Sequence, residues 1–313
     1  MTRAFVFPGQ GSQAVGMGKG LYDAFPAARA VFQEVDDALS DNLTRLIFEG
    51  PIEQLTLTEN AQPALMATSL AIVRVLENEG GVNLAKAAAY IAGHSLGEYS
   101  ALAAAGSLNL AEAAQLLRRR GEAMQAAVPV GEGAMAAILG LDLDAVAAVA
   151  KDAAEDGVCE VANDNAPGQV VLSGDSAAIE RAAVLAKERG AKRAMPLPVS
   201  APFHCSMLAP AATVMAEALD QVTLAAPRPA WVANVTAKAE NEPARMRTLL
   251  VEQVTSTVRW RETVLYMKAN GVDTLIELGA GKVLSGMVRR IDREVTGVSV
   301  QGPEDIDALV KSL

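Results

Sequence analysis

Histidine, cysteine and aromatic residues are scarce in this 313-residue sequence. It contains two histidines and two cysteines. Cys159 and Cys205 cannot build a disulfide framework, and without a cysteine cluster no metal site is expected. Aromatic residues make up 4% of the chain, whereas alanine, valine and leucine dominate. This composition suits helices packed on a buried parallel sheet.

Long apolar runs and an excess of positive charge are also missing. No apolar run approaches the roughly 18 residues that a membrane span needs, and the N-terminal segment is too soon interrupted by Pro8 to be a signal peptide. We therefore expect a cytoplasmic protein that does not enter the membrane. The formal net charge of −10 argues against nucleic acid as the main partner, because phosphate binding normally needs a basic surface.

The GxSxG motif Gly93-His94-Ser95-Leu96-Gly97 is the most informative feature that the sequence does contain. A short buried strand is predicted before it and an alanine-rich helix after it. This context is typical of a nucleophile elbow, the tight turn that presents a serine above the end of a strand. At the helix N-terminus, free backbone N–H groups and the helix dipole can stabilise an oxyanion.

A serine hydroxyl needs a base to take its proton, and the choice is between two histidines. His94 adjoins Ser95, and at a sharp turn the two side chains project in different directions. His204 is therefore the predicted base. Cys205 is an alternative nucleophile, but it adjoins His204 and lacks an elbow, so a packed thiol is the favoured interpretation.

The N-terminal glycine-rich loop invites a second interpretation. Gly9, Gly11 and Ala14 fit a dinucleotide-binding fingerprint after a strand. That fingerprint also needs a helix that starts at once and an acidic residue about 20 positions on, at the end of a second strand. Instead more glycines follow, and the acidic pair at 36–37 lies within a predicted helix. Nucleotide binding is therefore weakly supported.

The order of predicted elements divides the chain into two parts. Residues 128–198 follow a β-α-β-β-α-β order, which is the ferredoxin-like arrangement. Residues 1–127 and 199–313 alternate strand and helix, as a hydrolase-like parallel sheet requires. The predicted fold class is thus α/β, a parallel-sheet catalytic core with an inserted ferredoxin-like subdomain. Because Ser95 precedes the insertion and His204 follows it, we expect a cleft between the two parts beside the serine.

The elements behind this division come from hydrophobic periodicity and turn signals. The predicted strands are 3–7, 88–91, 134–139, 158–161, 169–173, 192–197, 229–234 and 273–278. The predicted helices are 26–39, 62–79, 98–105, 110–127, 143–154, 176–190, 210–220, 244–254, 261–270 and 282–291.

Three consecutive arginines in the predicted helix 110–127 differ in helical phase. At about 100° per residue, Arg120 lies roughly 60° from the centre of the apolar stripe, whereas Arg118 lies about 100° and Arg119 about 160° away. Arg120 is therefore predicted to point inward. An inward arginine can either bridge two helices through an ion pair or bind an anionic ligand.

Six motifs, in matching order and spacing, extend over nearly the whole chain. They are Phe7-Pro8-Gly9-Gln10-Gly11-Ser12-Gln13, Gly93-His94-Ser95-Leu96-Gly97-Glu98-Tyr99, Arg120-Gly121, Asn165-Ala166-Pro167-Gly168-Gln169, Pro198-Val199-Ser200-Ala201-Pro202-Phe203-His204 and Glu277-Leu278-Gly279. With them the sequence resembles the malonyl-CoA:acyl carrier protein transacylases, the acyltransferase family of bacterial fatty acid synthesis. One departure is Thr257, where many relatives have proline.

The resemblance implies a role for each matching position. Ser95 would be the nucleophile that becomes malonylated, and His204 the general base and later the acid for the leaving thiol. The backbone N–H groups of Gln10 and Leu96 would form the oxyanion hole. The backbone carbonyl of Gln253 would orient the histidine, so that no dedicated aspartate is needed.

Two further side chains would select the acyl group. The guanidinium of Arg120 would clamp the free carboxylate of malonyl-CoA with two parallel hydrogen bonds, which lysine cannot reproduce. Phe203 resembles the variant associated with malonyl rather than methylmalonyl units, since a bulky ring leaves little room for an α-methyl group.

The function implied by the resemblance is ping-pong transfer of malonyl from malonyl-CoA to the pantetheine thiol of acyl carrier protein, by a monomer without metal or redox cofactor. Because the carrier is acidic in this family, Lys192-Arg193, Lys282 and Arg289-Arg290 are candidate docking sites. A serine hydrolase would share the elbow and the base. A non-enzymatic scaffold would form no acyl-enzyme, and it is the weakest alternative because all the reactive residues are present.

Overall fold

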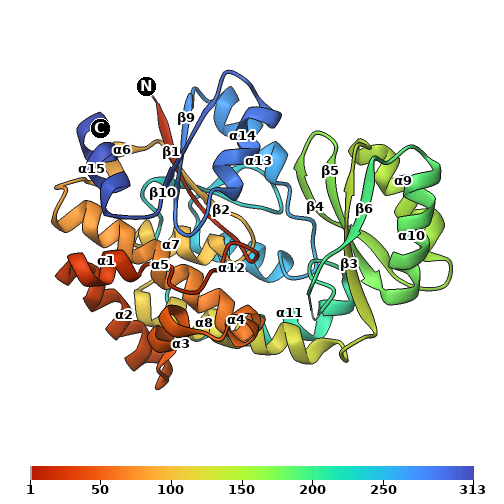
Figure 1. The fold of residues 1–313 in the computed structure, drawn as a ribbon, viewed down its shortest axis with the longest axis horizontal. Coiled ribbons are helices and arrows are strands. Elements are labelled where there is room, and N and C mark those ends of the chain that lie inside the picture. The colour runs from red at the N-terminus through yellow and green to blue at the C-terminus, as the bar shows by residue number, and fades with distance from the viewer. Residues whose placement is uncertain (1, 200) are drawn as a thin grey trace.

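The computed structural model describes residues 2–199 and 201–313, which form a large body and a smaller lobe (Figure 1). Met1, and Ser200 of the predicted motif 198–204, lie outside the described residues. The lobe is a continuous insertion in the chain, as its green colour in Figure 1 shows. Among the described residues, no helix is both long and apolar enough to span a bilayer.

The large body is built on a six-stranded sheet in the order β10-β9-β1-β2-β7-β8. Neighbouring strands are parallel except for the pair β7 and β8 at one edge. The strands are β1 (Arg3–Phe7), β2 (Tyr90–Gly93), β7 (Ala230–Val232), β8 (Ala239–Glu240), β9 (Thr274–Leu278) and β10 (Thr296–Val300). The parallel-sheet core predicted from the sequence is confirmed.

Helices cover both faces of this sheet because its strands bury side chains on both sides. In β1, Phe5 and Phe7 join the main core, whereas Ala4 and Val6 join a second core beneath two C-terminal helices. Those two are α13 (Trp260–Ala269) and α14 (Val283–Ile291). The main core is covered by α1 (Lys19–Ala24), α2 (Pro26–Leu39), α3 (Leu43–Glu49), α4 (Ile52–Thr56), α5 (Thr58–Asn78), α6 (Leu84–Ala87), α7 (Gly97–Ala104), α8 (Leu110–Ala127), α11 (Ala209–Asp220), α12 (Pro243–Glu252) and α15 (Pro303–Ser312).

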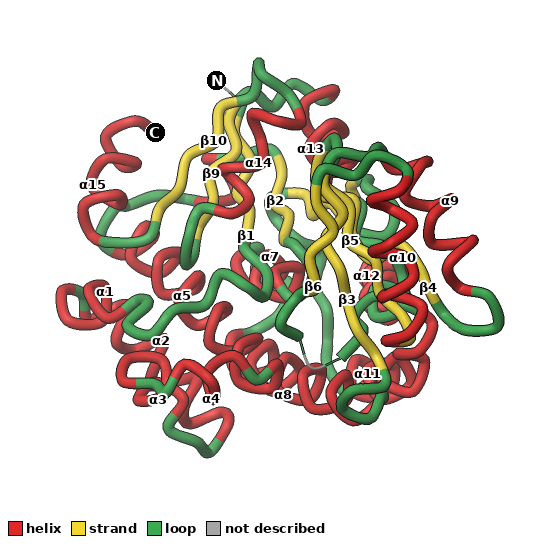
Figure 2. The backbone as a smooth tube through the Cα atoms, turned by 45° about the vertical axis from the view of Figure 1, so that its right-hand side comes forward, coloured by secondary structure: helices red, strands yellow, loops and turns green. Residues whose placement is uncertain are grey.

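The small lobe contains an antiparallel sheet in the order β4-β5-β3-β6. Its elements are β3 (Gly133–Leu139), α9 (Leu143–Ala154), β4 (Cys159–Ala166), β5 (Gln169–Asp175), α10 (Ser176–Glu188) and β6 (Arg193–Pro196). The inserted ferredoxin-like subdomain is confirmed, whereas its outer boundaries at residues 128 and 198 stay a prediction. Figure 2 shows α9 and α10 together on one face of this sheet.

Two predicted elements differ from the structure in an informative way. Helix α5 begins at Thr58, four residues before the predicted start, and it is buried almost all round rather than amphipathic. It lies between the sheet and helices α2 and α8, so it has little solvent-facing side. Strand β4 continues to Ala166, whereas the prediction ended it at Val161. The second half of β4 contains polar residues, so its sequence does not show the pattern of a strand. Tertiary contacts satisfy the hydrogen-bonding groups of these residues in the fold.

Short or terminal elements were missing from the sequence prediction. They are α1, α3, α4, α6, β8, β10, α15 and a 3-10 turn η1 (Ser206–Leu208). Most are too short to show a clear hydrophobic period, and packing on the main body stabilises them instead.

Candidate active site

The elbow is formed where β2 meets α7, and its backbone has no space for extra side-chain atoms. A Cβ on Gly93 would lie 1.9 Å from the carbonyl carbon of Gly97, and one on Gly97 would lie 2.4 Å from the carbonyl oxygen of Phe7. Ser95 itself has a positive φ of 53°. The two glycines therefore let the chain turn sharply enough to expose the serine.

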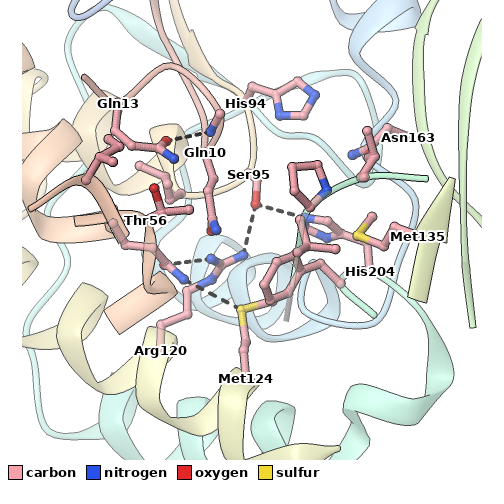
Figure 3. Close-up of a pocket in the computed structure, with 18 residues that line it drawn as sticks. Gln10, Gln13, Thr56, His94, Ser95, Arg120, Met124, Met135, Asn163 and His204 are labelled. Atoms are coloured by element: carbon pink, nitrogen blue, oxygen red, sulfur yellow. Dashed lines mark hydrogen bonds between the residues drawn. The ribbon is translucent and has the colours of Figure 1, made fainter. Parts of the chain in front are cut away.

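Ser95 and His204 come together although 109 residues separate them. The distance from Ser95 Oγ to His204 Nε2 is 2.8 Å (Figure 3). His204 Nδ1 lies 2.9 Å from the backbone oxygen of Gln253, which can only accept a hydrogen bond. Nδ1 therefore carries the proton, and Nε2 is free to accept the serine proton.

The surroundings of His204 keep its ring neutral. Burial, together with the positive charge of Arg120, lowers the pKa of His204 to about 3. An unprotonated imidazole can act as a base throughout the neutral range.

Arg120 points inward as helical phase predicts, and only 1% of its surface is exposed. Its Nη1 donates to Gln62 Oε1 at 2.7 Å, and its Nη2 donates to Gln253 Oε1 at 2.7 Å and to Ser95 Oγ at 3.2 Å. Figure 3 shows the guanidinium directly beside the serine.

The neighbouring arginines pair with carboxylates, but Arg120 does not. Arg118 contacts Asp41 and Arg119 contacts Glu217, whereas no carboxylate among the described residues lies within ion-pair distance of the Arg120 guanidinium. Its Nε has no acceptor either. The ion-pair interpretation is therefore wrong for Arg120. A buried cation bound only by neutral groups can accept an anionic ligand.

The predicted oxyanion-hole donors are available. Within the described part of the chain, the backbone N–H groups of Gln10 and Leu96 have no hydrogen-bond acceptor, and both residues line the cavity beside Ser95. The side chain of Gln10 accepts a 2.9 Å hydrogen bond from Thr58, which ties the N-terminal loop to α5.

The cavity has a volume of about 420 Å³ and lies between the two parts of the molecule. The large body contributes Ser95 and Arg120, and the lobe contributes Met135 and Asn163. Phe203 also lines it and is 8% exposed. The structure thus brings every predicted site residue to this cavity or into contact with a residue that lines it.

Three buried polar residues, Asn234, Glu98 and Gln253, support the elbow through hydrogen bonds. Asn234 accepts from the Ser95 N–H at 2.8 Å and donates to the Gly93 carbonyl at 2.7 Å. Glu98 accepts from the Asn234 N–H at 2.7 Å and from the Gln253 side chain. Burial raises the pKa of Glu98 to about 8. Sequence reasoning assigned no role to Asn234 or Glu98, although Glu98 belongs to the elbow motif.

The alternative candidates, His94 as the base and Cys205 as the nucleophile, make contacts with other residues. His94 Nε2 lies 2.9 Å from Asn165 Oδ1, and Figure 3 shows its ring directed away from Ser95. Cys205 donates to the Pro202 carbonyl at 3.1 Å, and burial raises the pKa of its thiol to about 11. A protonated, enclosed thiol is a poor nucleophile, so the packed-thiol interpretation holds.

Residues 4–302 match the acyl transferase domain family. Two curated relatives are malonyl CoA-acyl carrier protein transacylases: that of Bacillus subtilis is 48% identical over 99% of this chain and 96% of its own length, and that of Escherichia coli K12 is 46% identical over 98% of both. The solved acyl-carrier-protein-S-malonyltransferase of Bartonella henselae is 54% identical, with a TM-score of 0.98 over 100% of this chain and 99% of that one. A malonyl-transacylase solved in complex with its type II PKS acyl carrier protein is 42% identical, with a TM-score of 0.97 over the full length of both chains.

Proposed function

The chain belongs to the malonyl-CoA:acyl carrier protein transacylase family of acyl transferases, and from this premise we propose that it moves malonyl from malonyl-CoA to the pantetheine thiol of acyl carrier protein. The observation that carries the proposal is the position of Arg120, a buried guanidinium 3.2 Å from the hydroxyl of a histidine-bonded serine. A serine paired with histidine can transfer many acyl groups, but a buried cation beside it favours one that ends in a carboxylate.

In the first half-reaction, His204 Nε2 takes the hydroxyl proton as Ser95 Oγ attacks the thioester carbonyl. The negative oxygen of the tetrahedral intermediate accepts hydrogen bonds from the N–H groups of Gln10 and Leu96. When the intermediate collapses, the carbon–sulfur bond breaks and CoA leaves with the proton from Nε2. The malonyl group remains as an ester on Ser95.

The second half-reaction reverses these roles. His204 takes the proton of the carrier thiol, and the resulting sulfur attacks the ester carbonyl. Ser95 leaves with the proton returned by His204, and malonyl is now a thioester of the carrier. The Gln253 carbonyl accepts a hydrogen bond from the Nδ1 proton throughout, so that Nε2 remains the atom that takes up and releases protons.

Arg120 binds the malonyl carboxylate during both halves. Gln62 and Gln253 hold the guanidinium in place through neutral amide oxygens, so a carboxylate need not compete with an existing ion pair. Phe203 lines the same cavity, and its bulky ring is proposed to leave little room for a substituent on the acyl α-carbon.

The remaining parts of the proposal concern partners and location. The enzyme is proposed to act as a cytoplasmic monomer. It is also proposed to use no metal or redox cofactor, since a protein group gives or takes the proton in each transfer described above. Lys192, Arg193, Lys282 and Arg289 are proposed to meet the acidic carrier. Arg290 is less available, because its Nη1 donates to Gln169 Oε1 at 2.7 Å.

Intact-mass measurement tests the proposal directly. The protein is mixed with malonyl-CoA, and the expected result is a mass increase of one malonyl group that disappears when holo-acyl carrier protein is added and reappears on the carrier. Ser95→Ala should abolish the adduct. Rapid release of free malonate without carrier would indicate a hydrolase instead. Absence of both an adduct and malonate release would contradict both enzymatic interpretations.

A further inference from the structure

The general base stands in a loop with an unfavourable backbone conformation. His204 has a φ of 61°, in the left-handed region that residues other than glycine rarely occupy. Such a conformation persists only where surrounding contacts enforce it. The Nδ1 bond to Gln253 fixes the ring, but the backbone on either side needs its own restraints.

Two restraints on this backbone come from the inserted lobe. Before the histidine, Pro202 lies so close to the start of β3 that a Cβ on Gly133 would be 2.4 Å from its ring. Two residues after the histidine, Ser206 is bound by Glu160 of β4. One carboxylate oxygen accepts from the Ser206 N–H at 2.9 Å, and the other accepts from its hydroxyl at 2.6 Å.

Strand β4 also contacts the two other segments that carry site residues. The Val258 N–H donates to the Ala162 carbonyl at 2.9 Å, five residues after Gln253. Asn165 contacts His94 of the elbow at 2.9 Å. One strand of the lobe thus touches the elbow, the base loop and the segment that orients the base.

We propose that Glu160 is a positioning residue for the reaction, which acts from the lobe through Ser206 to hold the His204 backbone where Nε2 meets Ser95. A carboxylate that accepts two hydrogen bonds from one residue restricts both its backbone and its side chain. Without Glu160, the loop after His204 is free to relax its left-handed turn, and Nε2 moves away from Oγ. The lobe then supplies catalytic alignment in addition to a wall of the cavity.

The proposal rests on His204 being the base, and the test separates the two claims. Glu160→Ala, Glu160→Gln and the control Glu180→Ala are compared with the wild type. Glu180 is an exposed carboxylate on α10 of the same lobe, and it makes no hydrogen bond or ion pair with the residues that the structure describes. Steady-state malonyl transfer gives kcat and KM, and ¹⁵N-histidine spectra report each imidazole separately, since the chain has two histidines.

For Glu160→Ala we expect kcat to fall about tenfold while the KM for malonyl-CoA stays within about twofold, because alignment and not substrate binding is lost. The His204 ring signals should shift or broaden while those of His94 stay unchanged. Glu160→Gln should recover kcat to within about threefold, since its amide oxygen still accepts the Ser206 N–H. Glu180→Ala should match the wild type.

Wild-type kcat and unmoved His204 signals in Glu160→Ala would overturn the proposal. So would equal changes in both rings without recovery by Glu160→Gln, because these indicate general loosening of the fold. If the wild type forms no malonyl adduct, the proposed function fails instead, and the ring signals still decide whether Glu160 positions His204.

Discussion

Among single residues, Arg120 shows most clearly how burial determines a role. Moving a guanidinium out of water is unfavourable unless its donors are satisfied, and two glutamine side chains satisfy part of them. Among the described residues, no carboxylate lies within ion-pair distance of it. An anionic ligand would therefore recover free energy that is lost by burying the cation.

Replacing this side chain should change acyl preference. We expect Arg120→Ala to lower kcat/KM for malonyl-CoA about 100-fold, since a charge-assisted hydrogen-bonded pair is lost, and to lower that for acetyl-CoA much less. The rates are measured with both thioesters under identical conditions. Arg119→Ala is the matched control, because that residue is exposed and its nearest carboxylate is 3.9 Å away. An equal loss for both thioesters in Arg120→Ala would contradict the clamp.

The sequence predicts reactive residues better than the groups that support them. Ser95 stands out through its glycines, His204 through elimination of His94, and Arg120 through helical phase. Asn234 has no such signal, because its contacts join residues 139 and 141 positions apart and follow no local period. Its role becomes visible only when β7 is placed next to β2.

At the level of elements, the elbow helix α7 places a carboxyl group where two effects oppose each other. Glu98 lies in the first turn of α7, where the helix dipole favours the charged form by about 0.3–1 kcal/mol. Burial acts in the opposite direction and is larger, so the pKa of Glu98 is raised to about 8. The folded protein therefore binds this proton more tightly than the unfolded chain does.

This shift predicts the sign of a pH effect on stability. Because the pKa of Glu98 is higher in the folded protein, its contribution to the stability of the fold is favourable at low pH. That contribution is lost as the pH rises from about 4.5 to about 8. We expect the unfolding free energy of the wild type to fall relative to that of Glu98→Gln by about 1 kcal/mol or more over this window. Urea unfolding at a series of pH values measures the difference.

Glu122→Gln serves as the control for this comparison, since Glu122 is an exposed carboxylate on α8. If the difference in unfolding free energy between the wild type and Glu98→Gln is the same at all pH values, burial does not shift the pKa of this carboxyl group.

The prediction of elements from the sequence succeeded where a regular hydrophobic pattern extends over several turns. Helices α2, α8 and α9 have the predicted bounds, residue for residue. The second half of β4 lacks such a pattern because Asn163 and Asp164 are polar and yet buried. Their partners lie in the segment around Val258 and in α13, so only the assembled fold explains them.

Across the whole molecule, the lobe is held against the body by contacts between polar groups that are partly or fully buried. Arg261 of α13 binds Asp164 of β4 through Nη2 at 2.8 Å and through Nε at 2.9 Å. The Asp164 side chain is 2% exposed and that of Arg261 is 27% exposed. Removing the arginine leaves a buried carboxylate without its counter-charge, which is costlier than losing a surface ion pair.

We therefore expect Arg261→Ala to lower the free energy of unfolding by about 3 kcal/mol, at the low end for buried pairs because Arg261 is partly solvated. Adding Asp164→Asn to Arg261→Ala should restore part of the loss by removing the unpaired charge.

Arg259→Ala is the control: its partner Glu262 is one-third exposed, so we expect a loss of at most about 1 kcal/mol. Denaturant unfolding of the four proteins measures these differences. If Arg261→Ala and Arg259→Ala lose the same stability, the Arg261–Asp164 pair is no more than an ordinary surface contact, and the lobe is held by its apolar face and backbone hydrogen bonds.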